Sequence, residues 1–130
     1  MGNVISTFTN DVLGNMDATA IAQSIAKKEI SVQEVTEAAI ARAEKANPAL
    51  NAIVLRMYDD ARKFNAPTKG GLYGVPTFIK DSDNVAGYPT QLGTGAFKAK
   101  TAKRNSKFVG QFLSTGLNAL GKTTMPEFGL

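Results

Sequence analysis

The sequence predicts an α/β fold in which N-terminal helices are followed by a mostly parallel partial sheet. Apolar residues recur at helical spacing in the first third of the chain. Short apolar runs suited to strands then alternate with helical or loop segments, which is typical of an α/β unit. With 130 residues, 43% of them hydrophobic and 20% charged, the chain has the size and composition of one ordinary domain.

Two helices are expected first. Asp17 is a candidate N-cap for a helix over Ala18–Lys28. Ser31, followed three residues later by Glu34, forms a capping-box pattern that starts a second helix. The apolar stripe of this second helix ends at Asn47–Pro48, where we expect the helix to stop.

The residues before the first helix are expected to be a leader. We interpret residues 1–16 as a flexible segment and residues 17–130 as the domain proper. The opening residues Met1–Ser6 fit the loose pattern for N-myristoylation, which we interpret as a chance match because nothing around it indicates a second membrane signal.

A first strand and a second strand are predicted in the middle of the chain. The continuous apolar run within Asn51–Met57 suits a strand covered on both faces. A short helix over Tyr58–Phe64 and a loop over 67–74 follow. Val75–Lys80 is the second strand, in which Pro76 favours an edge position or the start of the strand.

The last third predicts an irregular stretch, a helix and a strand. Residues 85–101 carry three glycines and a proline, and we expect them to be irregular or briefly extended. Apolar residues at helical spacing predict a helix over Ser106–Thr115, with Gly116 ending it. Leu117–Leu120 is the third strand.

The composition limits the chemistry. The chain has no cysteine and no histidine, which excludes disulfides, thiolate or imidazole metal ligands, and a Ser-His or Cys-His couple. We therefore expect no metal or cofactor, and any reaction has to use Lys, Asp, Glu, Ser, Thr or Tyr. A net charge of +4 is too mild to indicate a dedicated nucleic-acid binder. No apolar run approaches a membrane span, so a cytoplasmic protein without membrane contact is expected.

Gly116–Thr123 matches the phosphate-loop pattern of nucleotide triphosphatases. That loop needs a strand before its first glycine and a helix that begins at the Lys-Thr pair. Here a helix precedes Gly116, the variable positions form an apolar strand, and Pro126 disfavours a following helix. We therefore reject a nucleotide site.

A run of basic residues leads into the helix predicted over Ser106–Thr115. It could bind phosphate or an acidic partner, or it could be an ordinary solvated loop. The second interpretation is favoured because aromatic residues stand only at its ends. Its five cations are Lys98, Lys100, Lys103, Arg104 and Lys107.

Lys80 is the candidate catalytic residue. It ends a strand beside Asp81, and the carboxyl ends of strands in α/β sheets are where ligands and catalytic groups gather. A lysine buried there can lose its proton and act as a general base. From spacing alone, an ordinary Lys-Asp strand terminus is the stronger interpretation.

Several segments, found in this order, resemble the N-terminal part of amidase signature family hydrolases. The resemblance extends from about residue 17 to the end of the chain, and the helix and strand between Ile30 and Val54 resemble the opening of the same family. The motif segments are Gly74–Asp81, Pro89–Thr90, Gly93–Thr94 and Gly121–Gly129.

The resemblance implies a hydrolase that acts on linear amides, in which Lys80 is the base of a Ser–cis-Ser–Lys triad. The chain ends at Leu130, before any Gly/Ser-rich segment that would carry both serines and the oxyanion donors. Thr94 stands where the family more often has serine, and Arg104–Ser106 where an Asp-Ala pair is commoner. We therefore expect an N-terminal portion of the larger amidase signature fold, inactive by itself, that self-associates and takes part in binding a small amide substrate only when completed. The alternative is a non-catalytic α/β module that binds a protein or nucleic acid through loop 98–107.

Overall fold

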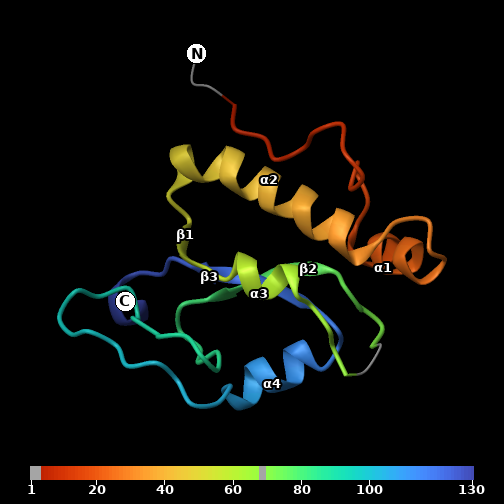
Figure 1. The fold of residues 1–130 in the computed structure, drawn as a ribbon. Coiled ribbons are helices and arrows are strands. Elements are labelled where there is room, and N and C mark those ends of the chain that lie inside the picture. The colour runs from red at the N-terminus through yellow and green to blue at the C-terminus, as the bar shows by residue number, and fades with distance from the viewer. Residues whose placement is uncertain (1–3, 68–69) are drawn as a thin grey trace.

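The computed structural model describes residues 4–67 and 70–130. The described chain forms a three-stranded sheet with helices on both sides of it, α2 on one side and α4 on the other (Figure 1). Its elements are α1 (Ala18–Ala26), α2 (Val32–Leu50), β1 (Ile53–Arg56), α3 (Tyr58–Arg62), β2 (Pro76–Lys80), α4 (Lys107–Leu113), β3 (Asn118–Thr123) and the 3₁₀ turn η1 (Glu127–Gly129).

The predicted helix starts are confirmed. The Asp17 carboxylate accepts a hydrogen bond from Ala20 N at 2.8 Å and caps α1. At the start of α2 the complete capping box is present: Ser31 Oγ accepts from Glu34 N at 3.1 Å, and the Glu34 carboxylate accepts from Ser31 N at 2.8 Å. Ser106 caps α4 in the same way, accepting from Val109 N at 3.2 Å.

The end of α2 differs from the prediction. The helix does not stop at Asn47–Pro48 but continues to Leu50, with Pro48 inside its last turn. A proline in this position removes one backbone hydrogen bond close to an end that loses its bonds anyway. Asn51, with a φ of 48°, ends the helix in the left-handed region, and the Asn47 side chain accepts from Ile53 N at 2.9 Å to turn the chain into β1.

The α/β class is confirmed, but the sheet is mixed rather than mostly parallel. Its order is β1-β3-β2, with β2 parallel and β1 antiparallel to the central β3. Apolar patterning marks strands but carries no information on pairing direction, which accounts for the difference. β1 is therefore an edge strand, and Val54, 48% exposed, shows that it is not covered on both faces. Pro76 begins β2 at the other edge, as predicted.

The central strand is longer than predicted. β3 continues past Leu120 to Thr123, and Gly121 and Lys122 within it are both buried. At its start the buried Asn118 side chain donates to Thr36 Oγ1 and to Ala61 O, each at 3.0 Å. These bonds join β3 to α2 and α3 and satisfy a polar group in the core.

The core lies in three clusters around the sheet. The first joins α1 and α2 to the segments that lead into β2 and β3, the second lies between α4 and β2, and the third lies between α2, α3 and β3. Their fully or nearly fully buried members include Val35, Ile79, Val109 and Leu120.

Part of the expected leader packs against the domain. The Asp11 carboxylate accepts two hydrogen bonds from the Arg42 guanidinium on α2, at 2.6 and 2.7 Å, and Leu13 is buried in the first cluster. Arg42 also donates to Gly14 O at 2.9 Å. The domain boundary at residue 16 remains a prediction, and the myristoylation pattern begins at residues outside those described.

Candidate active site

The two parallel strands bring their carboxyl ends together. Lys80 pairs with Thr123 in the register, and Asp81 N extends the ladder by donating to Thr123 O at 3.0 Å. Ile79 pairs with Lys122 one step earlier. The end of the sheet therefore holds two lysines and an aspartate at the position where α/β sheets carry reactive groups.

Lys80 is exposed at the end of β2. Within residues 4–67 and 70–130 its ammonium group makes no hydrogen bond or ion pair. The burial that the sequence led us to expect at this strand end is thus not provided by the described residues. The Lys80 side chain is instead accessible to solvent at the carboxyl end of β2.

Lys122 is the opposite case, and its role was missed by the sequence analysis. Its side chain is completely buried, and its Nζ donates to Asp81 Oδ1 at 2.7 Å, to Thr90 Oγ1 at 2.8 Å and to Pro89 O at 2.9 Å. The other Asp81 oxygen accepts from Gln91 N at 3.1 Å. Three donated bonds use the full capacity of an ammonium group. The signal in the sequence was a lysine inside an apolar strand, which the phosphate-loop match obscured.

The rejection of a phosphate loop agrees with the geometry. Lys122 lies inside β3, where a phosphate loop would place it at the start of a helix. The two glycines of the phosphate-loop pattern have other structural roles. Gly116, with a φ of 95°, forms the turn after α4, and Gly121 lies against the β1 backbone.

The loop from Ser82 to Asn105 folds over this end of the sheet and is held by its own side chains. Gln91 donates from its amide to Thr94 O at 2.9 Å and also to Phe97 O, and its side-chain oxygen accepts from Ala99 N at 3.1 Å. An isolated bridge joins Pro89 to Thr101, which matches the expectation of an irregular, briefly extended stretch.

Two further contacts attach the loop to neighbouring elements. The buried Thr94 donates from Oγ1 to the Glu127 carboxylate of η1. The Tyr88 hydroxyl donates to Asp60 of α3, and burial together with this carboxylate raises the pKa of Tyr88 to about 12. Tyr88 therefore stays a protonated donor at neutral pH, and the loop is fixed at both points.

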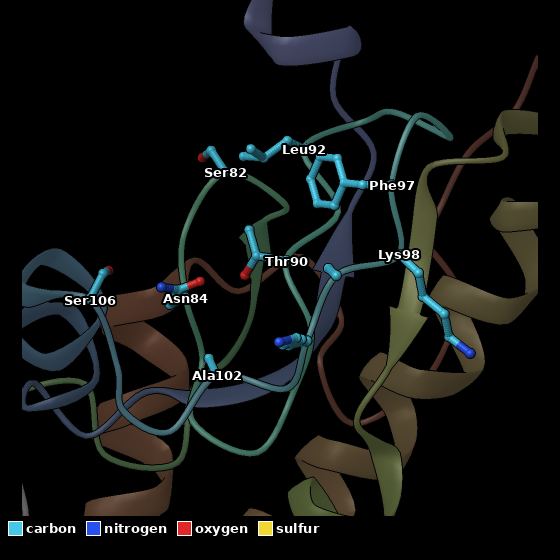
Figure 2. Close-up of a pocket in the computed structure, with 10 residues that line it drawn as sticks. Ser82, Asn84, Thr90, Leu92, Phe97, Lys98, Ala102 and Ser106 are labelled. Carbon is cyan, nitrogen blue, oxygen red and sulfur yellow. The ribbon is translucent and has the colours of Figure 1, made fainter.

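A hollow of about 570 Å³ is lined by residues between Ser82 and Ser106, in the segment that follows the end of β2. Figure 2 shows Leu92 and Phe97 close together at one end of it, Asn84 and Ser106 at the other, and Lys98 pointing away from both. Phe97 stacks on Phe128 of η1 with ring centroids 6.5 Å apart. The hollow thus has an aromatic end and a polar end, next to the strand terminus that carries Lys80.

The remaining sequence candidates do not join Lys80. All five cations of the basic run are exposed, an arrangement that suits a solvated surface as well as a binding surface, so partner binding there stays a prediction. Three serines in or near this part of the fold have local partners: Ser82 Oγ donates to Asp83, Ser106 caps α4, and Ser114 Oγ donates to Gln111 O. None has the environment of a nucleophile beside a base.

Residues 34–130 match the family model described as Amidase. The chain belongs to the amidase family. It is 44% identical over 128 residues to the putative amidase AmiC of Mycobacterium tuberculosis. This match covers 96% of this chain and 27% of that protein. It is 35% identical over 123 residues to the acylamidase of Rhodococcus erythropolis, covering 88% of this chain and 26% of that protein.

Solved amidase structures show the same fold. The structure of 6-aminohexanoate cyclic dimer hydrolase superposes with a TM-score of 0.80 at 32% identity, over 87% of this chain and 24% of that one. A bacterial aryl acylamidase of the amidase signature family gives a TM-score of 0.77 at 30% identity, over 87% of this chain and 26% of that one. The chain therefore spans about a quarter of the length of the relatives that it matches. In the part of the chain that the structure describes, no helix is long and apolar enough to cross a membrane.

Proposed function

We propose that this chain supplies the general base, Lys80, of an amide hydrolase whose serine nucleophile and bridging serine lie on chain outside these 130 residues. The observation that carries the proposal is the contrast between two lysines at one sheet end. Lys122 is buried and fully bonded, whereas Lys80 is exposed at the carboxyl end of β2 and has no partner among residues 4–67 and 70–130. Of the two, only Lys80 has a side-chain nitrogen that is not engaged with described residues and that could, as a neutral amine, accept a proton from a reacting group.

The reaction follows from the proton positions. Neutral Lys80 takes a proton from the bridging serine, which takes one from the nucleophilic serine as that oxygen bonds to the amide carbonyl carbon. The C–N bond then breaks, and the proton returns from Lys80 through the bridging serine to the leaving amine. Water hydrolyses the acyl-serine ester by the same route and releases the acid.

The substrate class we propose is a small amide, bound beside the strand end where the hollow lies. The Leu92 and Phe97 end of the hollow suits an apolar or aromatic group. The isolated chain has a base without a nucleophile, so we expect no turnover of aryl amides or esters above background.

A transplant tests the proposed role. The matching 123-residue segment of the Rhodococcus acylamidase is replaced by this chain, and hydrolysis of an aryl amide is measured. We expect the chimera to be active, and Lys80→Ala to lower its kcat by roughly 10²- to 10⁴-fold, the usual contribution of a general base. Lys45→Ala, at an exposed lysine on α2 that does not line the hollow, is the matched control and should retain activity. An active chimera that tolerates Lys80→Ala would refute the proposal.

A further inference from the structure

The side chain of Gln91 organises the loop that lines the hollow, and the reaction just described does not use it. Its amide nitrogen donates to Thr94 O at 2.9 Å and to Phe97 O, and its amide oxygen accepts from Ala99 N at 3.1 Å. Both N–H donors and the oxygen of this amide are therefore engaged with backbone groups. One side chain thus gathers backbone groups from across residues 94–99.

The residues that Gln91 holds form the apolar end of the hollow. Leu92 follows Gln91 directly, and Phe97 supplies one of its acceptors; both line the hollow and lie close together in Figure 2. Residues 91–100 form neither helix nor strand. Because no regular backbone ladder shapes this wall, its arrangement depends on side-chain hydrogen bonds such as those of Gln91.

The backbone of this wall is held in an unusual conformation. Leu92 has a φ of 56°, in the left-handed region that a bulky residue rarely adopts. Such a residue persists only where its surroundings over-determine it, and residues of this kind gather at ligand clamps. Leu92 O accepts from Phe128 N at 2.9 Å, so η1 fixes the wall from one side while Gln91 fixes it from the other.

The backbone of Gln91 is itself anchored to the sheet. Its N–H donates to Asp81 at 3.1 Å, and the Asp81 carboxylate accepts from the buried Lys122 ammonium at 2.7 Å. The same ammonium donates to Pro89 O and to Thr90 Oγ1. The chain just before the wall is therefore tied to β3, and Gln91 stands where the anchored part of the loop ends and the lining part begins.

We propose that Gln91 is a positioning residue that holds Leu92 and Phe97 in place at the apolar end of the hollow and so sets the affinity for the aryl group of an amide. This inference rests on the proposed binding of a small amide at the hollow. A preformed wall binds more tightly than a mobile one, because the ligand does not have to order it. Gln91 acts through Leu92 and Phe97 and has no part in the proton transfers.

Binding of acetanilide, a small aryl amide, to the 130-residue chain tests this role in an NMR titration. On the original chain we expect chemical-shift changes at the Leu92 and Phe97 amides. Gln91→Met keeps the length of the side chain but removes its hydrogen bonds, and its Kd should rise at least about threefold, because only loops in the binding arrangement take up the ligand. Gln111→Met, at an exposed glutamine on α4 that does not line the hollow, is the matched control and should keep the Kd within about twofold.

Amide hydrogen exchange separates positioning from a general loss of stability. The Ala99 amide donates to Gln91 and should exchange faster in Gln91→Met, while the amides of β3 keep their protection. Faster exchange at Ala99 with an unchanged Kd would show that Gln91 stabilises the loop without affecting binding, and it overturns the inference. An original chain that acetanilide does not bind near Leu92 and Phe97 also overturns it.

Gln91→Glu is the second variant, and it decides the question if Gln91→Met loses the protection of β3. Its carboxylate keeps the acceptor for Ala99 N but has no donors for Thr94 O and Phe97 O. A raised Kd in a folded Gln91→Glu chain supports the inference, whereas the original Kd overturns it. Loss of the fold in both variants would show a general structural role and would overturn it as well.

This test is independent of the transplant assay, because binding requires no proton transfer. An active chimera that tolerates Lys80→Ala refutes the base role and leaves the comparison of Kd values standing. A Kd that does not respond to Gln91 refutes the positioning role and leaves the assignment of Lys80 standing.

Discussion

Arg42 on α2 binds the N-terminal segment through the Asp11 carboxylate and through two backbone carbonyl groups, those of Thr9 and Gly14. It donates to Asp11 from two nitrogens, at 2.6 and 2.7 Å, and the pair is mostly shielded, with 13% and 22% of the two side chains exposed. The guanidinium hydrogen bonds lower the pKa of Asp11 well below its usual range. A carboxyl group with a lowered pKa in the folded state stabilises the fold above its unfolded pKa of about 4 and loses that contribution as the pH falls further.

We therefore expect Asp11→Asn to lower the free energy of unfolding by about 1 to 2 kcal/mol at pH 7, because it removes a bidentate, charge-assisted contact. The difference from the original chain should shrink as the pH falls below about 4, because protons then bind Asp11 in the unfolded chain before they bind it in the folded chain. Urea denaturation at several pH values measures both effects.

Asp59→Asn is the matched control for this prediction. Asp59 also faces an arginine, Arg62, but at 3.6 Å and with 93% of its side chain exposed, so its removal should change stability by less than about 0.5 kcal/mol. Equal effects of the two variants would show that the Asp11 contact contributes no more than a surface pair.

At the scale of single residues, the sequence predicted what local patterns encode. The predicted caps Asp17 and Ser31 depend on neighbours within three positions, and the structure confirms them. Lys80 was selected by its place at a strand end together with a family motif. The partnership of Lys122 with Asp81 joins residues 41 positions apart in the sequence and depends on the register of two strands, which the local pattern does not carry.

At the scale of elements, Gly121 allows β3 to lie close to the backbone of β1. A Cβ at Gly121 would lie 2.3 Å from Leu55 O of β1, closer than any real side chain approaches backbone. The glycine of the apparent phosphate loop is thus explained by the close approach of two strands.

We expect Gly121→Ala to lower the free energy of unfolding by about 2 to 3 kcal/mol, because β1 would have to move away from β3. Gly110→Ala is the comparison: the added Cβ meets nothing within 4 Å, and alanine in the middle of α4 should stabilise the chain by about 0.5 to 1 kcal/mol. Thermal or urea unfolding of both variants gives the two signs. A neutral Gly121→Ala would mean that β1 does not pair at this distance in solution.

Element boundaries were less predictable than element types. The sequence correctly predicted four helices and three strands of the described chain in order, but it ended the second helix at Asn47–Pro48 instead of Leu50 and the third strand at Leu120 instead of Thr123. At α2 the Pro48 signal was overridden at a helix end where the Asn47 side chain accepts hydrogen bonds from Ala52 and Ile53. At β3 the end of the apolar run was overridden by pairing with both neighbouring strands.

At the scale of the whole molecule, β1 and β2 are the edge strands of the sheet formed by residues 4–67 and 70–130, and large apolar side chains are exposed in the loop and in the C-terminal segment after β3. Phe97, Phe128 and Leu130 are 43%, 53% and 97% exposed. Exposed strand edges and apolar surface favour association with another chain. We therefore expect the 130-residue chain to form dimers or larger assemblies.

Analytical sedimentation over a wide concentration range measures this association. The sedimentation coefficient should rise with concentration, and Phe97→Ser with Phe128→Ser should weaken the rise. A compact monomer at the highest concentration that unfolds cooperatively would instead indicate a self-sufficient domain and would favour the binding-module alternative for loop 98–107.

The central claim is that the amine of Lys80 moves protons during amide hydrolysis. The chain has no cysteine, so in the acylamidase chimera Lys80→Cys introduces one thiol into the transplanted segment, which 2-bromoethylamine converts into a lysine analogue. We predict that Lys80→Cys reduces kcat at least 100-fold and that aminoethylation restores at least about a tenth of the original rate, because a base contributes roughly 10²- to 10⁴-fold. The unsubstituted chimera treated with the same reagent controls for other thiols. Complete modification without recovery of aryl amide hydrolysis would contradict the account.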